Sequence, residues 1–145
     1  MAYSKATKEA NTRIAMPYLI EKGWTPMQAA AIVGNLTAES YMHPHTPDGD
    51  LGTAVGLAQW RGDRQAKFQE IVGKPIKKSS LRDQLFFVNW ELRNTHKKAG
   101  KLLIAAKSLK EAVAILDKHY ERSYGGALDR RIKFAEEALE KYGRP

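Results

Sequence analysis

Apolar positions recur at the spacing of an α-helix along most of this chain. The clearest helix start is the run Thr25-Pro26-Met27-Gln28, because Thr can cap a helix, Pro suits its first position and Gln can complete a capping box. One side of the helix predicted from there carries small and branched residues, namely Ala29, Ile32, Val33, Leu36 and Ser40. We expect this stripe to face the protein core.

Capping residues and apolar periodicity predict four further helices. They lie at about 63–72, at about 80–94, from Ser108 to about Tyr120, and from Leu128 to Tyr142. Gly73 and Pro75 should end the first of these, because Gly favours a helix C-terminus and Pro cannot continue a helix. An earlier helix before Gly23 is also predicted, and Pro17 should kink or interrupt it.

Residues 43–58 depart from the helical pattern, because Pro and Gly are interspersed there with Asp, Thr and His. Such a composition predicts turns with at most a short β hairpin. No internal repeat or linker interrupts the chain. We therefore predict a mainly α fold in which residues 1–145 form a single domain, with this polar segment carrying binding groups.

Composition narrows the class of protein. The chain has 145 residues, of which 43% are hydrophobic and 28% are charged, as is typical of one soluble globular domain. No apolar run approaches the roughly 18 residues that a membrane span needs, so we expect no membrane insertion. The N-terminus lacks the apolar stretch of a secretory signal, and the absence of Cys excludes disulfides.

The net charge of +8 favours a polyanionic partner such as nucleic acid, anionic lipid or a bacterial wall polymer, without choosing among them. The basic residues are spread along the chain, which is typical of solvated helix faces. A non-catalytic basic module that binds nucleic acid or cell wall therefore stays open as an alternative to an enzyme.

Glu39 is the principal candidate for chemistry. It lies at the edge of the apolar stripe near the end of its predicted helix, a half-apolar setting that suits a carboxylic acid able to protonate a leaving sugar oxygen. Asp48 and Asp50 are candidates for the second carboxylate that glycoside cleavage commonly uses. Because their separation from Glu39 cannot be obtained from sequence, retention and inversion of the anomeric centre both stay open, and Asp48 is equally consistent with a turn.

Two residues that follow the polar segment are candidates for sugar binding. Gln59 can donate and accept hydrogen bonds to hydroxyl or N-acetyl groups. Trp60 offers a flat apolar face to a pyranose ring, although a Trp is more often a core residue. His43 and His45 lack a third ligand at metal-site spacing, so we expect no metal and no cofactor.

Three separated blocks resemble the phage tail lysozyme group of the lysozyme-like superfamily, which includes phage endolysins and muramidases. The blocks are Gly34-Asn35-Leu36-Thr37-Ala38-Glu39-Ser40, Gly56-Leu57-Ala58-Gln59-Trp60 with Arg64 after it, and Tyr120-Glu121-Arg122-Ser123. The resemblance implies a helical fold of the α+β lysozyme type with a small β-hairpin lobe beside the active-site cleft. It also implies that Glu39 is the general acid that cleaves the β-1,4 bond between N-acetylmuramic acid and N-acetylglucosamine.

In related phage-type lysozymes an Asp and then a Thr follow the acid at set spacings. Asp48 fits the first spacing, and Thr53, a substrate-binding candidate, comes one residue early. The resemblance thus implies a peptidoglycan glycan strand as partner, without nucleic acid, and we expect a monomer. For such an enzyme, the lack of a secretory signal fits either release from the host cytoplasm through a holin-type pore or carriage in the virion. Lytic transglycosylation of the same bond is the close alternative.

Overall fold

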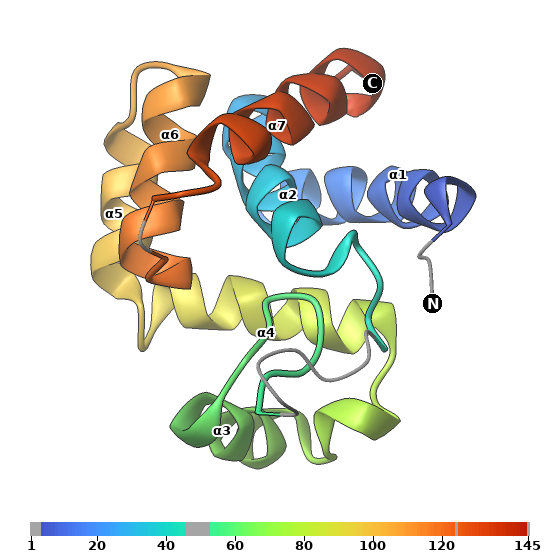
Figure 1. Cartoon of the computed structure of the whole chain (residues 1–145). Helices are drawn as coiled ribbons and strands as arrows, with labels where there is room; N and C mark the ends of the chain where they lie inside the picture. Colours follow the sequence, from blue (N-terminus) through green and yellow to red (C-terminus); the bar gives the residue numbers. More distant parts are fainter. Residues whose placement is uncertain (1–3, 46–52, 124, 145) are drawn as a thin grey trace.

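The computed structural model describes residues 4–45, 53–123 and 125–144, and the part it describes is dominated by helices (Figure 1). In chain order the elements are α1 (Lys5–Glu21), α2 (Pro26–Ser40), α3 (Gly62–Val72), the 3-10 turn η2 (Ile76–Lys78), α4 (Leu81–Arg93), α5 (Lys97–Ala105), α6 (Leu109–Leu116), the π-helical turn η3 (Asp117–Glu121) and α7 (Leu128–Tyr142). The mainly helical prediction is confirmed.

Helix α2 is the centre of the larger group of helices, where it packs against α1, α6 and α7. The predicted capping box between Thr25 and Gln28 is present at its start. Residues 28–37 are all buried, so the helix is surrounded on every side instead of burying a single stripe. The small residues Ala29, Ala30, Ala31 and Gly34 explain this close packing, because they let neighbouring helices approach the α2 backbone.

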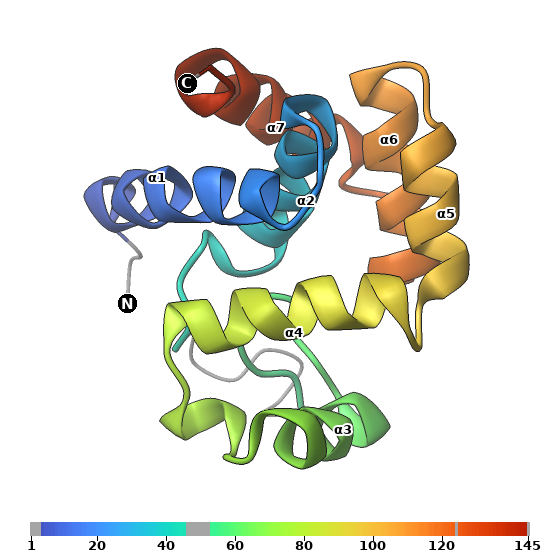
Figure 2. The ribbon, with the colours of Figure 1, turned by 180° about the vertical axis from the view of Figure 1, so that it is seen from behind.

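Helix α4 separates this group from a smaller one formed by α3, η2 and the turn before α3, as the two opposite views show (Figures 1 and 2). The smaller group has an aromatic core in which the rings of Trp60, Phe68 and Phe87 lie with their centroids 5.0 to 5.6 Å apart. Trp60, the last residue of the turn before α3, therefore packs against α3 and α4.

The β-hairpin lobe is not seen in the described ranges. What they contain is one isolated antiparallel bridge, in which Val55 and Trp60 exchange backbone hydrogen bonds of 3.0 and 2.9 Å. Gly56, with φ of 83°, lets the chain reverse direction between these two residues. Part of the segment predicted as turns therefore forms a tight turn that is closed by a single bridge.

Two helices differ from the sequence prediction. Helix α1 continues through Pro17 without interruption, although Pro cannot donate a helical hydrogen bond. Helix α5 was not predicted, and it contains Gly100, where an added Cβ would lie 2.0 Å from the carbonyl oxygen of Leu92. A residue that disfavours helices on propensity is required there by the close approach of α4.

The predicted helix after Ser108 changes character part of the way along. It is α-helical from Leu109 to Leu116 and then widens into the π-helical turn η3, which is followed by Arg122 with φ of 59°. Single π-helical turns are rare and frequently mark functional sites. Across the described residues, no helix combines the length and the apolar character that spanning a membrane requires.

Candidate active site

Glu39 lies in the last turn of α2 and borders a cavity of about 530 Å³. The other lining residues are Ala58, Gln59 and Arg61 from the turn before α3, Asp63 and Arg64 from α3, and Glu121, Arg122 and Ser123 from the end of η3 and the residues after it. This volume is within the range of small-molecule binding sites. The structure thus brings Glu39 and Gln59, two of the predicted site residues, to one polar cavity.

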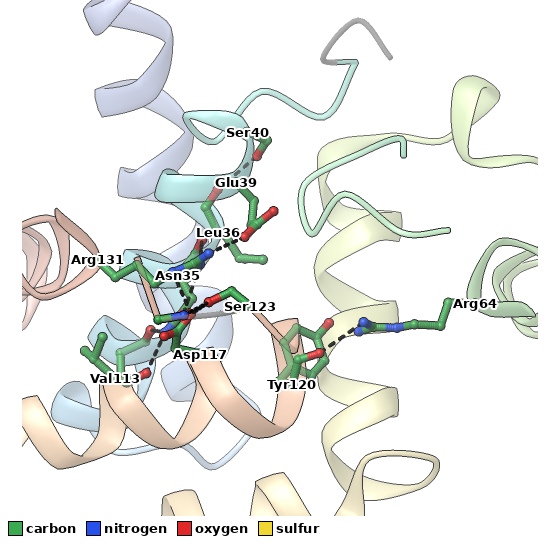
Figure 3. A network of polar contacts seen from close by, with 12 residues as sticks. Asn35, Leu36, Glu39, Ser40, Arg64, Val113, Asp117, Tyr120, Ser123 and Arg131 are labelled. Carbon is green, nitrogen blue, oxygen red and sulfur yellow. Dashed lines mark hydrogen bonds and ion pairs between the residues drawn. The ribbon is translucent and has the colours of Figure 1, made fainter. Parts of the chain in front are cut away.

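The carboxylate of Glu39 is held by Arg131 from the first turn of α7 (Figure 3). Its Oε2 atom accepts a hydrogen bond of 2.5 Å from Arg131, while the side chain stays 21% exposed toward the cavity. The same guanidinium donates to the backbone and side-chain oxygens of Asn35, both at 3.2 Å, and its Nε lies 2.9 Å from Oδ1 of Asp117. A charge-assisted contact of this kind stabilises the carboxylate anion and fixes its direction.

Arg131 reaches Glu39 because α2 and α7 cross very closely. An added Cβ on Gly34 would lie 2.6 Å from the Cβ of Ala135 and 2.7 Å from the carbonyl oxygen of Arg131. The absence of a side chain at Gly34 therefore sets the depth at which α7 packs. Sequence reasoning missed Arg131 because it lies 92 positions from Glu39, and no local signal links the two.

Glu121 is a second carboxyl group in the cavity, supplied by the last residue of η3. The residue is partly exposed, yet its Oε2 atom is buried and has no hydrogen-bond partner within the described ranges. Burial raises the pKa of Glu121 well above the ordinary value of 4.5, and the negative charge of Glu39 raises it further. From the sequence, Glu121 was noted only as a member of the block Tyr120-Glu121-Arg122-Ser123, and no role was predicted for it.

Gln59 is held in position by the turn that it completes. Its backbone has φ of 54°, and its side-chain amide donates a hydrogen bond of 3.0 Å to the carbonyl oxygen of Gly56. The side chain is half-buried and borders the cavity. A primary amide has a further N–H and a carbonyl oxygen, so this position suits recognition of a hydroxyl or N-acetyl group.

Trp60 does not border the cavity. The residue is completely buried, its ring packs against Phe68 and Phe87, and its indole N–H donates a hydrogen bond of 2.9 Å to Glu91. The ring face that we expected to carry a sugar is therefore covered by protein side chains. The structure assigns Trp60 to the core that supports the turn.

Glu91 on α4 organises the floor beneath the cavity. Its carboxylate accepts two hydrogen bonds of 2.8 Å from Arg64 and one of 2.7 Å from the hydroxyl of Tyr120, in addition to the bond from Trp60. Arg64 also donates to the backbone oxygen of Tyr120 at 3.0 Å, a contact visible in Figure 3. This buried network fixes α3, α4, the turn and η3 relative to one another.

Of the remaining predicted site residues, the structure describes Thr53 alone. Asp48 and Asp50 lie outside the described residues. Thr53 is exposed and does not border the cavity, and its carbonyl oxygen accepts a hydrogen bond of 3.0 Å from Gln65. In the ranges 4–45, 53–123 and 125–144, no three His, Cys, Asp or Glu side chains are grouped as a metal site would require.

Comparison with known proteins adds one match. The family model described as phage tail lysozyme matches residues 10–142, which is most of the chain and includes all the cavity residues named above. No curated protein matches the chain.

Proposed function

The chain belongs to the phage tail lysozyme family, and from this premise we propose that it is a muramidase, which hydrolyses the β-1,4 bond between N-acetylmuramic acid and N-acetylglucosamine in peptidoglycan. The family supports a lysozyme-type cell wall hydrolase in general. The observation that carries the specific proposal is the position of Glu39, a partly exposed carboxyl group that faces a polar cavity of about 530 Å³.

Glu39 acts as the general acid in this proposal. It donates a proton to the glycosidic oxygen while the bond from that oxygen to the anomeric carbon breaks and positive charge develops on the sugar. Arg131 keeps the carboxyl group directed into the cavity, and the amide of Gln59 holds a sugar substituent beside it. Asp48 or Asp50 is the proposed second carboxylate, on the basis of sequence spacing alone.

The net charge of +8 suits an anionic wall, because it favours association with a polyanionic surface. We propose that the enzyme is phage-encoded and serves penetration or lysis of the host wall. Both carriage in the virion and release from the host cytoplasm agree with family membership.

Digestion of purified peptidoglycan tests which glycosidic bond is cleaved and whether it is cleaved by hydrolysis. The products are reduced with borohydride and identified by mass spectrometry, and we expect reduced N-acetylmuramic acid at the new chain ends. New ends of reduced N-acetylglucosamine would identify the other glycosidic bond, and exclusively 1,6-anhydro ends would identify a lytic transglycosylase. If no sugar ends are released while DNA is bound tightly at low salt, the basic binding module replaces the enzyme.

The variant Glu39→Gln keeps the size of the side chain and removes its acidic proton. We expect a loss of at least about 100-fold in the initial rate, since general acid catalysis contributes on that order or more. Glu136→Gln is the matched control, because Glu136 is exposed on α7 away from the cavity. A Glu39→Gln variant that digests peptidoglycan at the parent rate would contradict the assignment of Glu39 as the general acid.

A further inference from the structure

Glu121 is a carboxyl group that the mechanism above does not use, although it borders the same cavity as Glu39. We propose that Glu121 holds the proton of the carboxyl pair in the free enzyme and delivers it to Glu39, which passes it to the glycosidic oxygen. Glu121 is thus a positioning residue that acts through Glu39. This inference rests on the proposed function.

The position of Glu121 is fixed by contacts on both of its sides. The preceding residue, Tyr120, donates from its hydroxyl to Glu91 and accepts at its backbone oxygen from Arg64. On the other side, the Ser123 hydroxyl is hydrogen-bonded to Asp117, and the Ser123 backbone N–H donates to the Asp117 carbonyl at 3.0 Å. These contacts limit how far the backbone of Glu121 can move.

Burial of a carboxyl oxygen without a partner opposes folding, because a buried polar group that lacks a hydrogen bond loses its hydration. Among the described residues, the buried Oε2 atom of Glu121 has no hydrogen-bond partner. An apolar side chain of similar size would avoid the penalty at this position. Groups of this kind cluster at functional sites, where a carboxyl group that keeps its proton near neutral pH is needed.

The charges around Glu121 come from four helices. Glu39 on α2 and Glu91 on α4 oppose ionisation of Glu121, whereas Arg64 on α3 and Arg131 on α7 favour it. Both guanidiniums are already engaged, since Arg64 is bonded to Glu91 and Tyr120 and Arg131 is bonded to Glu39 and Asn35. Desolvation dominates, and the pKa of Glu121 is raised well above its ordinary value.

The two carboxyl groups therefore have opposite environments. Glu39 accepts a charge-assisted hydrogen bond of 2.5 Å from Arg131, whereas the carboxyl group of Glu121 is desolvated, which raises its pKa. Two interacting carboxyl groups in one site titrate as a pair and can share a single proton. The pair then has one proton, which we place on Glu121 because its Oε2 atom is buried without a partner among the described residues.

The proton can be followed through the reaction. When substrate binds, the proton moves from the Glu121 carboxyl group to the Glu39 carboxylate, so that the pair keeps one proton and one negative charge. Glu39 next transfers the proton to the glycosidic oxygen as the bond to the anomeric carbon breaks. Water then adds its oxygen to that carbon, and the proton that the water releases returns to the carboxyl pair. Water and glycoside are consumed, and two sugar ends are formed.

The test compares pH profiles of kcat/KM on purified peptidoglycan for the parent, Glu121→Gln and the control Glu136→Gln. At pH 7 we expect Glu121→Gln to lose about 10- to 100-fold, a substantial part of the usual contribution of a general acid. We expect a smaller loss as the pH falls, because solvent then supplies the proton more readily, and an alkaline limb that lies at lower pH than in the parent. Glu136→Gln should follow the parent.

Two outcomes would overturn the inference: a Glu121→Gln profile that coincides with the parent's, or an equal loss at every pH, which indicates only a structural role. Both differ from failure of the proposed function, in which the parent itself releases no sugar ends or Glu39→Gln stays active. If Glu121→Gln does not fold, carboxyl carbon NMR of the parent replaces it. We expect one Glu to titrate well above the others and to titrate at lower pH in Glu39→Gln, and ordinary titration of every Glu would equally overturn the inference.

Discussion

Gly34 and Ala135 face each other where α2 crosses α7, and their contact leaves no room for a side chain on Gly34. An added Cβ would lie 2.6 Å from the Cβ of Ala135, 2.7 Å from the backbone oxygen of Arg131 and 2.8 Å from the backbone nitrogen of Ala135. Two of these three obstacles are backbone atoms, so a change of side-chain rotamer cannot relieve them. This crossing sets how Arg131 is presented to Glu39.

Gly34→Ala should therefore displace α7 and weaken both the fold and the site. We expect a loss of about 1–3 kcal/mol in the free energy of unfolding, as is typical of overpacking, together with reduced peptidoglycan digestion. Urea unfolding measures the first effect. Gly126→Ala is the control, because no described residue other than its chain neighbours lies within 4 Å of an added Cβ there. Equal stability of the Gly34→Ala variant and the parent would show that the helices can separate without cost.

Arg131→Lys tests whether the shape of the guanidinium matters beyond its charge. A Lys ammonium cannot reproduce the planar fork that contacts Glu39, Asn35 and Asp117 at the same time. We expect a loss of about 1–3 kcal/mol in unfolding free energy for each buried polar group left unsatisfied, and a lower kcat. Arg130→Lys, at the exposed neighbouring position, should change little. Parent-like kcat in Arg131→Lys would contradict a role in directing Glu39.

The sequence predicted elements whose signals are local. The Thr25–Gln28 capping box and the C-terminal Gly73, which has φ of 90°, mark helix ends that the structure confirms. Gln59 directly follows a recognisable turn segment, and this local signal singled out a residue that borders the cavity. Helix α5 was missed because it has no side-chain cap and contains Gly100, whose role depends on α4.

The parts of the site that the sequence did not predict depend on distant partners. Helical periodicity identifies a buried face, but it does not say which residue will meet that face from another helix. The pairing of Glu39 with Arg131 arises in this way, and so does the position of Glu121, which the π-helical turn creates. Trp60 shows the same limit, since only the packing around it distinguishes a core ring from an exposed one.

Glu91→Gln should be severely destabilising, because a single amide oxygen cannot accept all the hydrogen bonds from Trp60, Arg64 and Tyr120. The charge of Arg64 would also stay buried without its partner. Removal of one member of a buried ion pair costs about 3–5 kcal/mol, and we expect a loss of that size in urea unfolding. Glu70→Gln breaks an exposed pair with Lys67 and should cost at most about 1 kcal/mol. Similar losses in the two variants would contradict the central role of Glu91.

The environment of His96 makes the stability of the fold depend on pH. It is buried at the start of α5 with its Nε2 lacking a hydrogen-bond partner among the described residues, and its Nδ1 lies 3.0 Å from the Thr95 hydroxyl. Burial, followed by the positive charge of Arg64, lowers the pKa of His96 from 6.5 to about 4, although Glu91 opposes the shift. The folded protein therefore binds this proton less tightly than the unfolded chain does.

A lowered pKa in the folded state means that the neutral ring contributes stability above pH 6.5, and that this contribution is lost as the pH falls from 6.5 through about 4. We expect the free energy of unfolding of the parent to decrease over that window. His96→Asn cannot be protonated there, so its free energy of unfolding should depend less on pH, and the exposed control His45→Asn should follow the parent. Urea unfolding at several pH values between 4 and 7 measures the slopes. Identical slopes in the parent and His96→Asn would mean that His96 accepts its proton as easily in the folded protein as in the unfolded chain.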